Sequence, residues 1–154
     1  MPLSSGCHHV TIVTEDMDRF IAFYCSMFDA EPTLDMDEGP LRHAMIDLGA
    51  GFSLHPFEFK EGSPQGTGAP EQFGRGHIDH LAIQFDDRAA FETVRRRLVD
   101  AGATDGRLAD FGVVHVVEFT DPDGMICEIA MWAAGEPLSF PERRLEAYDP
   151  NATD

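Results

Sequence analysis

The feature that most constrains this chain of 154 residues is a single internal repeat. One segment, HVTIVTEDMDRFIAFYCSMFDAEP, starts at His9, and a second, HLAIQFDDRAAFETVRRRLVDAGA, starts at His80. Each begins with a histidine and an alternating apolar stretch, passes through a pair of acidic residues, and then places apolar residues at helical spacing. The repeat therefore predicts two modules that both begin with a strand followed by an amphipathic helix.

The second half of each repeat also matches. In the first module a strand precedes a Gly49–Gly51 turn, and a further strand follows it; in the second, the Asp121–Gly124 turn takes the same place. The pattern predicts the order βαβββ in each module, within an α+β fold class. We predict one domain, residues 1–154, whose parts are module one (7–59), a linker (60–75), module two (76–132) and a tail (133–154).

Charge and composition exclude several kinds of partner. The chain has 28 acidic and 11 basic residues, a formal net charge of -17, so we expect no nucleic acid and no anionic membrane surface as partner. No apolar run approaches the roughly 20 residues that cross a bilayer. The three cysteines are odd in number and scattered, which is typical of reduced thiols and predicts a cytoplasmic location.

Four residues at matched places are candidate metal ligands. His9 and His80 start the two repeats, whereas His55 and Glu128 are each the fourth residue after the last glycine of their turn. A single histidine on a strand is more often structural, so the prediction depends on the matched positions. Imidazole nitrogen and carboxylate oxygen suit a divalent ion. Strand alternation points both leading histidines away from the apolar stripes, and packing of the repeats about a pseudo-twofold axis is expected to bring all four onto one concave surface.

The two modules resemble the paired βαβββ modules of the vicinal oxygen chelate superfamily, which includes glyoxalase I, bleomycin-resistance proteins, fosfomycin-resistance enzymes and extradiol dioxygenases. The resemblance covers about residues 7–132, and its most characteristic pieces are HVTIVTEDMDRFIAFY and DPDGMICEI. It implies a cup-shaped half-barrel sheet with flanking helices, and one metal held by residues of the first and last strand of each module. It also implies a small-molecule substrate and a homodimer.

Within this superfamily, His55 is the informative departure. Enzymes similar to glyoxalase I have Glu at that place. A histidine there leaves His9, His80 and Glu128 as two imidazoles and one carboxylate, the ligand set of non-haem Fe(II) oxygenases, and the catalytic modules of extradiol dioxygenases are similar. The resemblance therefore favours Fe2+, with Ni2+, Zn2+ or Mn2+ as alternatives. His55 is either a fourth ligand or an acid/base beside the metal.

Glu118 is the candidate catalytic base. It lies on the strand before that of Glu128, and regular alternation points Glu118 and Val116 into the pocket. The competing interpretation is a solvent-exposed carboxylate at a sheet edge. We predict a metal-dependent dioxygenase-like or glyoxalase-like (lyase or isomerase) enzyme acting on a small oxygen-chelating substrate. The alternative is a non-catalytic protein of the bleomycin-resistance type that binds and sequesters a small molecule.

Overall fold

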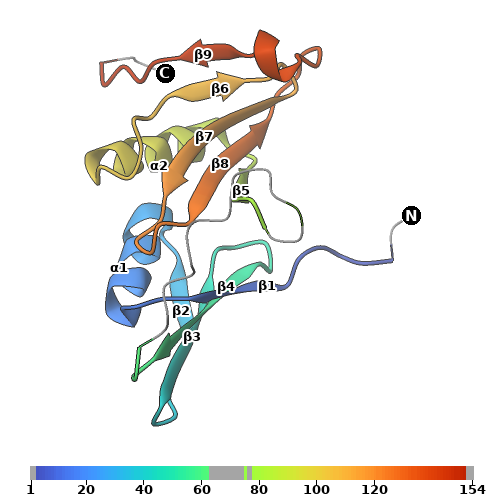
Figure 1. Cartoon of the computed structure of the whole chain (residues 1–154). Coiled ribbons are helices and arrows are strands. Elements are labelled where there is room, and N and C mark those ends of the chain that lie inside the picture. Colours follow the sequence, from blue (N-terminus) through green and yellow to red (C-terminus); the bar gives the residue numbers. More distant parts are fainter. Residues whose placement is uncertain (1–2, 63–74, 76–77, 152–154) are drawn as a thin grey trace. The chain divides into compact units, whose positions relative to one another are not determined.

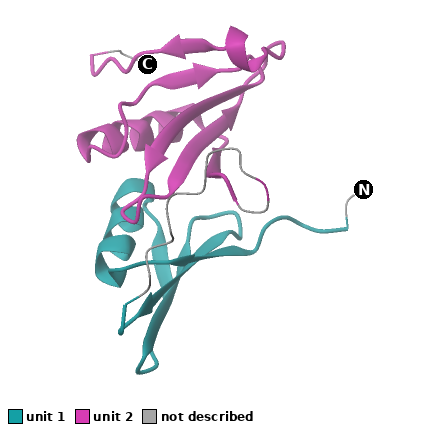
Figure 2. Ribbon diagram, viewed as in Figure 1, with its two compact units in different colours: residues 1–68 teal, residues 69–154 magenta. Residues whose placement is uncertain are grey.

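The computed structural model describes residues 3–62, 75 and 78–151. The chain divides into two compact units, Met1–Gly68 and Ala69–Asp154, which are coloured separately in Figure 2. Residues 63–74 of the predicted linker (60–75) and residues 76–77, the start of predicted module two, lie outside the described residues. The predicted domain boundaries stay a prediction. In the described part of the chain no helix is long and apolar enough to cross a membrane.

The described part of unit 1 contains one helix and a four-stranded sheet (Figure 1). Its elements are β1 (His9–Val13), α1 (Met17–Phe28), β2 (Glu31–Asp37), β3 (Leu41–Asp47) and β4 (Ser53–Phe59). The strand order is β1-β4-β3-β2, with β1 parallel to β4 and the other neighbours antiparallel. The first and last strands of the module are therefore adjacent.

Unit 2 repeats this arrangement and adds one strand. Its elements are β5 (Leu81–Phe85), α2 (Arg88–Asp100), β6 (Leu108–Asp110), β7 (Val114–Thr120), β8 (Ile126–Trp132), the 3-10 helix η1 (Phe140–Glu142) and β9 (Arg144–Glu146). The order is β5-β8-β7-β6-β9, again with the first strand parallel to β8. The α+β class and the two βαβββ modules expected from the repeat are confirmed.

The two helices begin where the acidic pairs of the sequence predict. The Asp16 carboxylate accepts from the Arg19 backbone N–H at 3.0 Å, and Asp87 accepts from the N–H groups of Ala89 and Ala90. Such capping satisfies backbone donors that have no partner inside the helix. The second helix ends at Asp100 with Ala101 as its C-cap, and Gly102 follows with a positive φ of 71°, a conformation that glycine adopts without strain.

Each helix covers one face of its sheet and forms the core there. In unit 1, Phe20 and Tyr24 of α1 are fully buried, as are Ala44, Ile46 and Leu54 of the sheet. Unit 2 is built likewise. Its most buried apolar side chains are Phe91, Leu98, Val117, Phe119, Cys127 and Ile129. Because side chains alternate along a strand, the residues between these buried ones lie on the opposite, open face of each sheet.

The C-terminal tail packs along the free edge of β6. Leu145 of β9 pairs with Ala109, and Figure 1 shows β9 running beside β6 at the end of the sheet. Before it, Ser139 and Glu142 form a capping box that starts η1. Gly112, in the turn between β6 and β7, lies so close to the Glu136 carbonyl that a Cβ would overlap it. The tail is therefore fitted to this unit through both backbone pairing and close contact.

Candidate metal-ligand pairs

The four predicted ligands occupy equivalent places in the two sheets. In unit 1, Thr11 lies opposite His55 in the parallel β1·β4 pair. In unit 2, Ala82 lies opposite Glu128 in the parallel β5·β8 pair. His9 comes two residues before Thr11, and His80 comes two residues before Ala82. Each histidine is thus a diagonal, same-face neighbour of the last-strand residue in its own unit.

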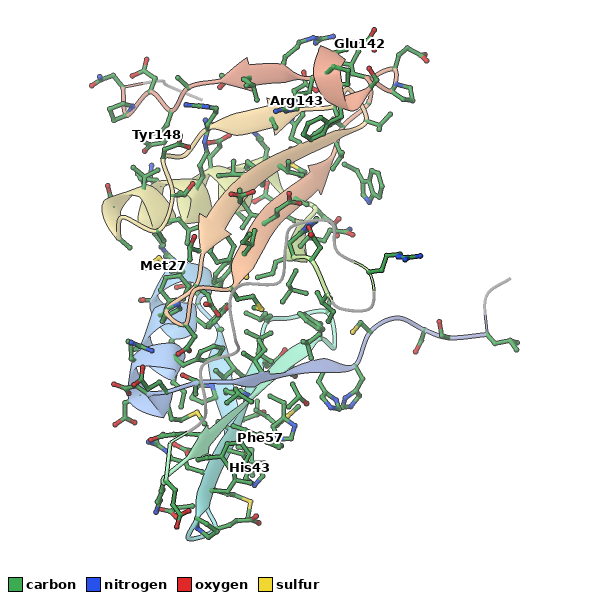
Figure 3. The ribbon with its side chains drawn as sticks, viewed as in Figure 1. Met27, His43, Phe57, Glu142, Arg143 and Tyr148 are labelled. Carbon is green, nitrogen blue, oxygen red and sulfur yellow. The ribbon has the colours of Figure 1, made fainter. Side chains whose placement is uncertain are left out.

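The open face of unit 1 holds a group of imidazoles. The His9 and His55 rings have centroids 5.5 Å apart, and His43 Nδ1 lies 3.1 Å from His55 Nε2. The Nδ1 atoms of His8 and His9 are 2.8 Å apart. Figure 3 labels His43 and Phe57 of this face, whose ring centroids are 5.6 Å apart. The unit therefore presents several nitrogen donors close together on one side of its sheet.

Burial and neighbouring imidazoles favour the neutral form of His55. Burial lowers the pKa of its ring, and the adjacent His43 and His9 lower it further. Neutral imidazole is the form that coordinates a metal or accepts a proton. The environment of His55 thus suits either of the two roles predicted for it.

In unit 2, the pair consists of His80 and Glu128. His80 Nε2 lies 3.6 Å from Glu128 Oε2, and His80 Nδ1 lies 2.9 Å from Asp79 Oδ2. The hydrogen bond to Asp79 raises the pKa of His80, with Glu128 adding to the effect and burial opposing it. A carboxylate on Nδ1 is the usual partner of a metal-binding histidine, because it fixes the ring and leaves Nε2 available.

The Glu118 side chain belongs to the same face as Glu128. The two residues lie directly opposite each other in the antiparallel β7·β8 pair. Burial raises the pKa of Glu128, and Glu118 and Asp79 raise it further while His80 lowers it. The predicted alternation of β7 is confirmed, because Val117 and Phe119 are buried in the core. Two carboxylates on neighbouring strands form an anionic centre that suits a cation.

A pocket of about 910 Å³ opens on unit 2 and includes these residues in its lining. His80, Glu118 and Glu128 are among its polar residues, and Val114 and Val116 are part of its apolar wall. Three residues of the C-terminal tail also line the pocket: Phe140, Arg143 and Leu145. This pocket is large enough for a small organic molecule beside the His80–Glu128 pair.

Among residues 3–62, 75 and 78–151, no group of three or more His, Cys, Asp or Glu side chains is arranged to hold a metal ion. What the described structure brings together is one pair in each unit: His9 with His55, and His80 with Glu128. The donor types fit a divalent ion of borderline or hard character, and the Asp79 contact fits a histidine oriented for coordination.

Three residues that contribute to these pairs or to the pocket were not predicted from the sequence: His43, Asp79 and Arg143. His43 was not among the residues singled out from the sequence, yet it alternates with the buried Ala44 and Ile46 and so shares the open face of His55. That alternation was a usable signal. Asp79, next to His80, had no signal in the pattern, and neither did Arg143, whose part in the pocket depends on where the tail folds.

Comparison with known proteins agrees with this architecture. The sequence matches the model of the Glyoxalase/Bleomycin resistance protein/Dioxygenase superfamily over residues 6–129. No curated protein matches the sequence significantly. Among solved structures, a glyoxylase/bleomycin resistance protein/dioxygenase domain from Frankia sp. EAN1pec is 22% identical with a TM-score of 0.69, and the match covers 86% of this chain and 96% of that chain.

Two further structures have this fold. Lactoylglutathione lyase from Agrobacterium tumefaciens is 20% identical with a TM-score of 0.57, over 84% of this chain and 96% of that chain. A mutant of the fosfomycin resistance protein FosX from Listeria monocytogenes, complexed with Mn(II) and dihydroxypropylphosphonic acid, is 20% identical with a TM-score of 0.58. That match covers 87% of this chain and 95% of that chain. At these identities the likeness concerns the fold, and function has to be argued from the residues.

Proposed function

Since the chain belongs to the Glyoxalase/Bleomycin resistance protein/Dioxygenase superfamily, we propose that it is a metal-dependent enzyme acting on a small organic substrate. The proposed ligands are His9, His55, His80 and Glu128, two from each unit. A divalent ion held by them would act as a Lewis acid toward oxygen atoms of the substrate. Fe2+ is the favoured ion because the imidazoles of His9 and His80 and the carboxylate of Glu128 form a set that suits it, with Ni2+, Zn2+ and Mn2+ as alternatives.

The observation that supports this proposal most is the matched register of the two pairs. The same diagonal relation joins His9 to His55 and His80 to Glu128, on the open face of each sheet. Residues that only stabilise a fold have no need to be coordinating types at all four places. The FosX structure, which is complexed with Mn(II) and a phosphonic acid, supports a divalent ion and a small ligand in a related protein.

The proposed role of Glu118 is that of general base. Its position opposite Glu128 puts it on the pocket-lining side of β7, where it can take a proton from a substrate bound in the pocket. His55 is a fourth ligand or an acid/base beside the ion. Between the two reactions considered, a dioxygenase needs O2 and Fe2+, whereas a lyase or isomerase needs only proton transfer and a Lewis acid.

Metal analysis tests the proposal first. The protein is purified without an affinity tag or chelator, its metal content is measured, and it is then loaded anaerobically with Fe(II). Near one iron per chain, with oxygen uptake on a panel of catechols, is the expected result for a dioxygenase. Nickel, zinc or manganese without oxygen uptake supports the lyase or isomerase. No bound metal under any loading contradicts the metal-dependent enzyme.

Substitutions then test the ligand assignment. Loss of one ligand in H80A or E128A is expected to weaken metal affinity by more than about 100-fold, since losing a mere orienting contact already costs about 10–100-fold. H115A is the matched control, because His115 lies 3.4 Å from Asp110 and 3.1 Å from Arg88, outside the proposed set. Titration with Mn(II) measures both. Equal affinity in E128A and H115A would remove Glu128 from the site.

His55 has its own test. If it is a ligand, H55A is expected to weaken metal binding; if it is an acid/base, H55A is expected to keep the metal and lose turnover. H115A is again the control, because His115 lies 3.4 Å from Asp110 and 3.1 Å from Arg88, outside the proposed set.

The second candidate function is binding and sequestration of a small molecule. The pocket of about 910 Å³, with its partly apolar lining, favours this candidate independently of the proposed metal ligands.

We further propose a cytoplasmic homodimer. The three free cysteines, Cys7, Cys25 and Cys127, fit a reducing compartment, and light scattering of the purified protein tests the dimer.

A further inference from the structure

The pocket of unit 2 contains a cation supplied by the C-terminal tail. Arg143 follows η1, and Figure 3 labels it next to Glu142 at the end of this segment. Its guanidinium lies 4.0 Å from the centroid of the Phe140 ring, and Nη1 donates to the Phe140 carbonyl at 2.6 Å. Stacking and one hydrogen bond hold the group in place while leaving its other N–H groups for a ligand.

Within the described part of the chain, Arg143 differs from its basic neighbours in having no acidic partner. Arg144 lies 3.2 Å from Asp110, and Arg107, which also lines the pocket, lies 3.4 Å from Asp105. Among the described residues no carboxylate pairs with Arg143, although the chain has 28 acidic residues and only 11 basic ones. A half-buried guanidinium left unpaired in so acidic a protein is suited to an anion from outside.

The position of Arg143 also indicates the length of that ligand. Glu128 lies on β8, whereas Arg143 adjoins β9, three strands away in the order β8-β7-β6-β9. At ~4.8 Å per strand this separation is roughly 14 Å along the sheet. Between them the wall is mainly apolar, formed by Phe111, Val116 and Leu145 among others.

We propose that this pocket takes an organic anion whose oxyanion group, a carboxylate or a phosphonate, is bound by Arg143, whose apolar body crosses the sheet, and whose other end reaches His80 and Glu128. The inference rests on the proposed function, because it names the substrate class of the same site. Arg143 is then a specificity-determining residue. It draws toward the pocket a ligand that the net charge of the chain otherwise repels.

Calorimetric titration of the full chain with phenylbutyrate and with phenylbutanol, which differ in charge but share an apolar body, tests this inference. Phenylbutyrate is expected to bind at least about tenfold more tightly, a factor equivalent to about 1.4 kcal/mol. R143Q is expected to abolish that preference, R143K to keep part of it, and R144Q, the matched control, to keep all of it. Phenylbutylphosphonate in place of phenylbutyrate distinguishes the two oxyanions.

The titration is done both on the protein as purified and after chelator treatment, because a bound metal would itself attract a carboxylate. A preference that survives the chelator and disappears in R143Q supports the anion subsite. Equal binding of acid and alcohol, or an unchanged preference in R143Q, overturns it. If the proposed function itself is wrong, H80A and E128A would still bind metal. That outcome is independent of the acid–alcohol preference measured in R143Q.

Discussion

Units 1 and 2 have the same strand order and the same parallel pairing of first and last strand, yet their open faces differ in chemistry. Unit 1 brings imidazoles together, with His43 and His55 in direct contact. Unit 2 places Glu118 opposite Glu128. The backbone register is therefore preserved between the repeats while the donor types on the open face have diverged. The open face of unit 1 therefore presents mainly nitrogen donors, and that of unit 2 mainly carboxylate oxygens.

The two units also differ at the edge of the sheet. Every residue of β2, the edge strand of unit 1, is exposed, whereas β6 of unit 2 is paired with β9. An unpaired edge can add a foreign strand, and charged residues such as Asp35 and Asp37 discourage this in β2. The tail therefore moves the edge of the unit 2 sheet from β6 to β9 and supplies part of the pocket lining.

The largest expected effect is that of truncating the equivalent core phenylalanines, which tests whether the two units pack their cores alike. Phe20 and Phe91 each come eleven residues after the leading histidine, and both are 0% exposed. We expect F20A and F91A each to reduce the free energy of unfolding by about 3–5 kcal/mol, because both leave a large cavity under a helix. Urea denaturation measures this. A cost near zero for either would mean that its unit does not pack as described.

A matched pair of glycines tests the tail contact. Gly39 and Gly112 lie in equivalent hairpin turns with φ of 92° and 79°, but only a Cβ at Gly112 meets the Glu136 backbone. We expect G39A to cost about 1 kcal/mol, from backbone strain alone. G112A should cost more, about 2–3 kcal/mol, because the overpacked tail must also shift. Thermal unfolding compares the two, and equal losses would contradict close packing of the tail on this turn.

The Asp121 side chain lies in the turn before the strand of Glu128, where Leu48 takes the matching place in unit 1. Asp121 is 4% exposed, and its Oδ1 accepts from the backbone N–H groups of Asp123 and Met125 at 2.9 and 2.8 Å. We expect D121A to cost about 1–3 kcal/mol, because two buried donors lose their acceptor. D121N keeps the acceptor, so its loss should be below about 1 kcal/mol. Similar losses in both variants would contradict this account.

Asp121 is also expected to make the stability of the fold depend on pH, and this is the smallest of the expected effects. Burial raises the pKa of Asp121 above its ordinary value of 3.8. Between that value and the raised one, the folded chain holds a proton that the unfolded chain has released, so stability falls as pH rises through this interval and then levels off. We expect D121N to have a flatter stability curve there, measured by urea denaturation at a series of pH values. An equal slope in both proteins would refute the assignment.

Much of the fold followed from local patterns in the sequence. The acidic pairs containing Asp16 and Asp87 predicted where the helices begin, and strand alternation predicted that Val117 is buried and Glu118 is not. These features depend on near neighbours in the chain, for which spacing is enough. The matched places of His55 and Glu128 followed from the repeat in the same way.

What could not be predicted depends on contacts between distant residues. The segment Arg144–Glu146 is three exposed residues with no strand pattern, and it becomes a strand only because β6 offers a free edge. The stacking of Arg143 on Phe140, and hence the cation in the pocket, follows from that pairing. Likewise, the contact of His43 with His55 needs the register of β3 against β4.

The parallel pairing of first and last strands has a consequence for how each unit folds during synthesis. Val10 pairs with Leu54, and Leu81 pairs with Cys127, so neither sheet can be completed until the end of its module has left the ribosome. Pairing of residues so far apart in the chain is slow, because a long loop must close before the contact is gained. Until then only the hairpins of the earlier strands, β2 with β3 and β6 with β7, can form. The histidine-bearing N-terminal strand of unit 1 is expected to gain hydrogen-exchange protection only after its hairpin does.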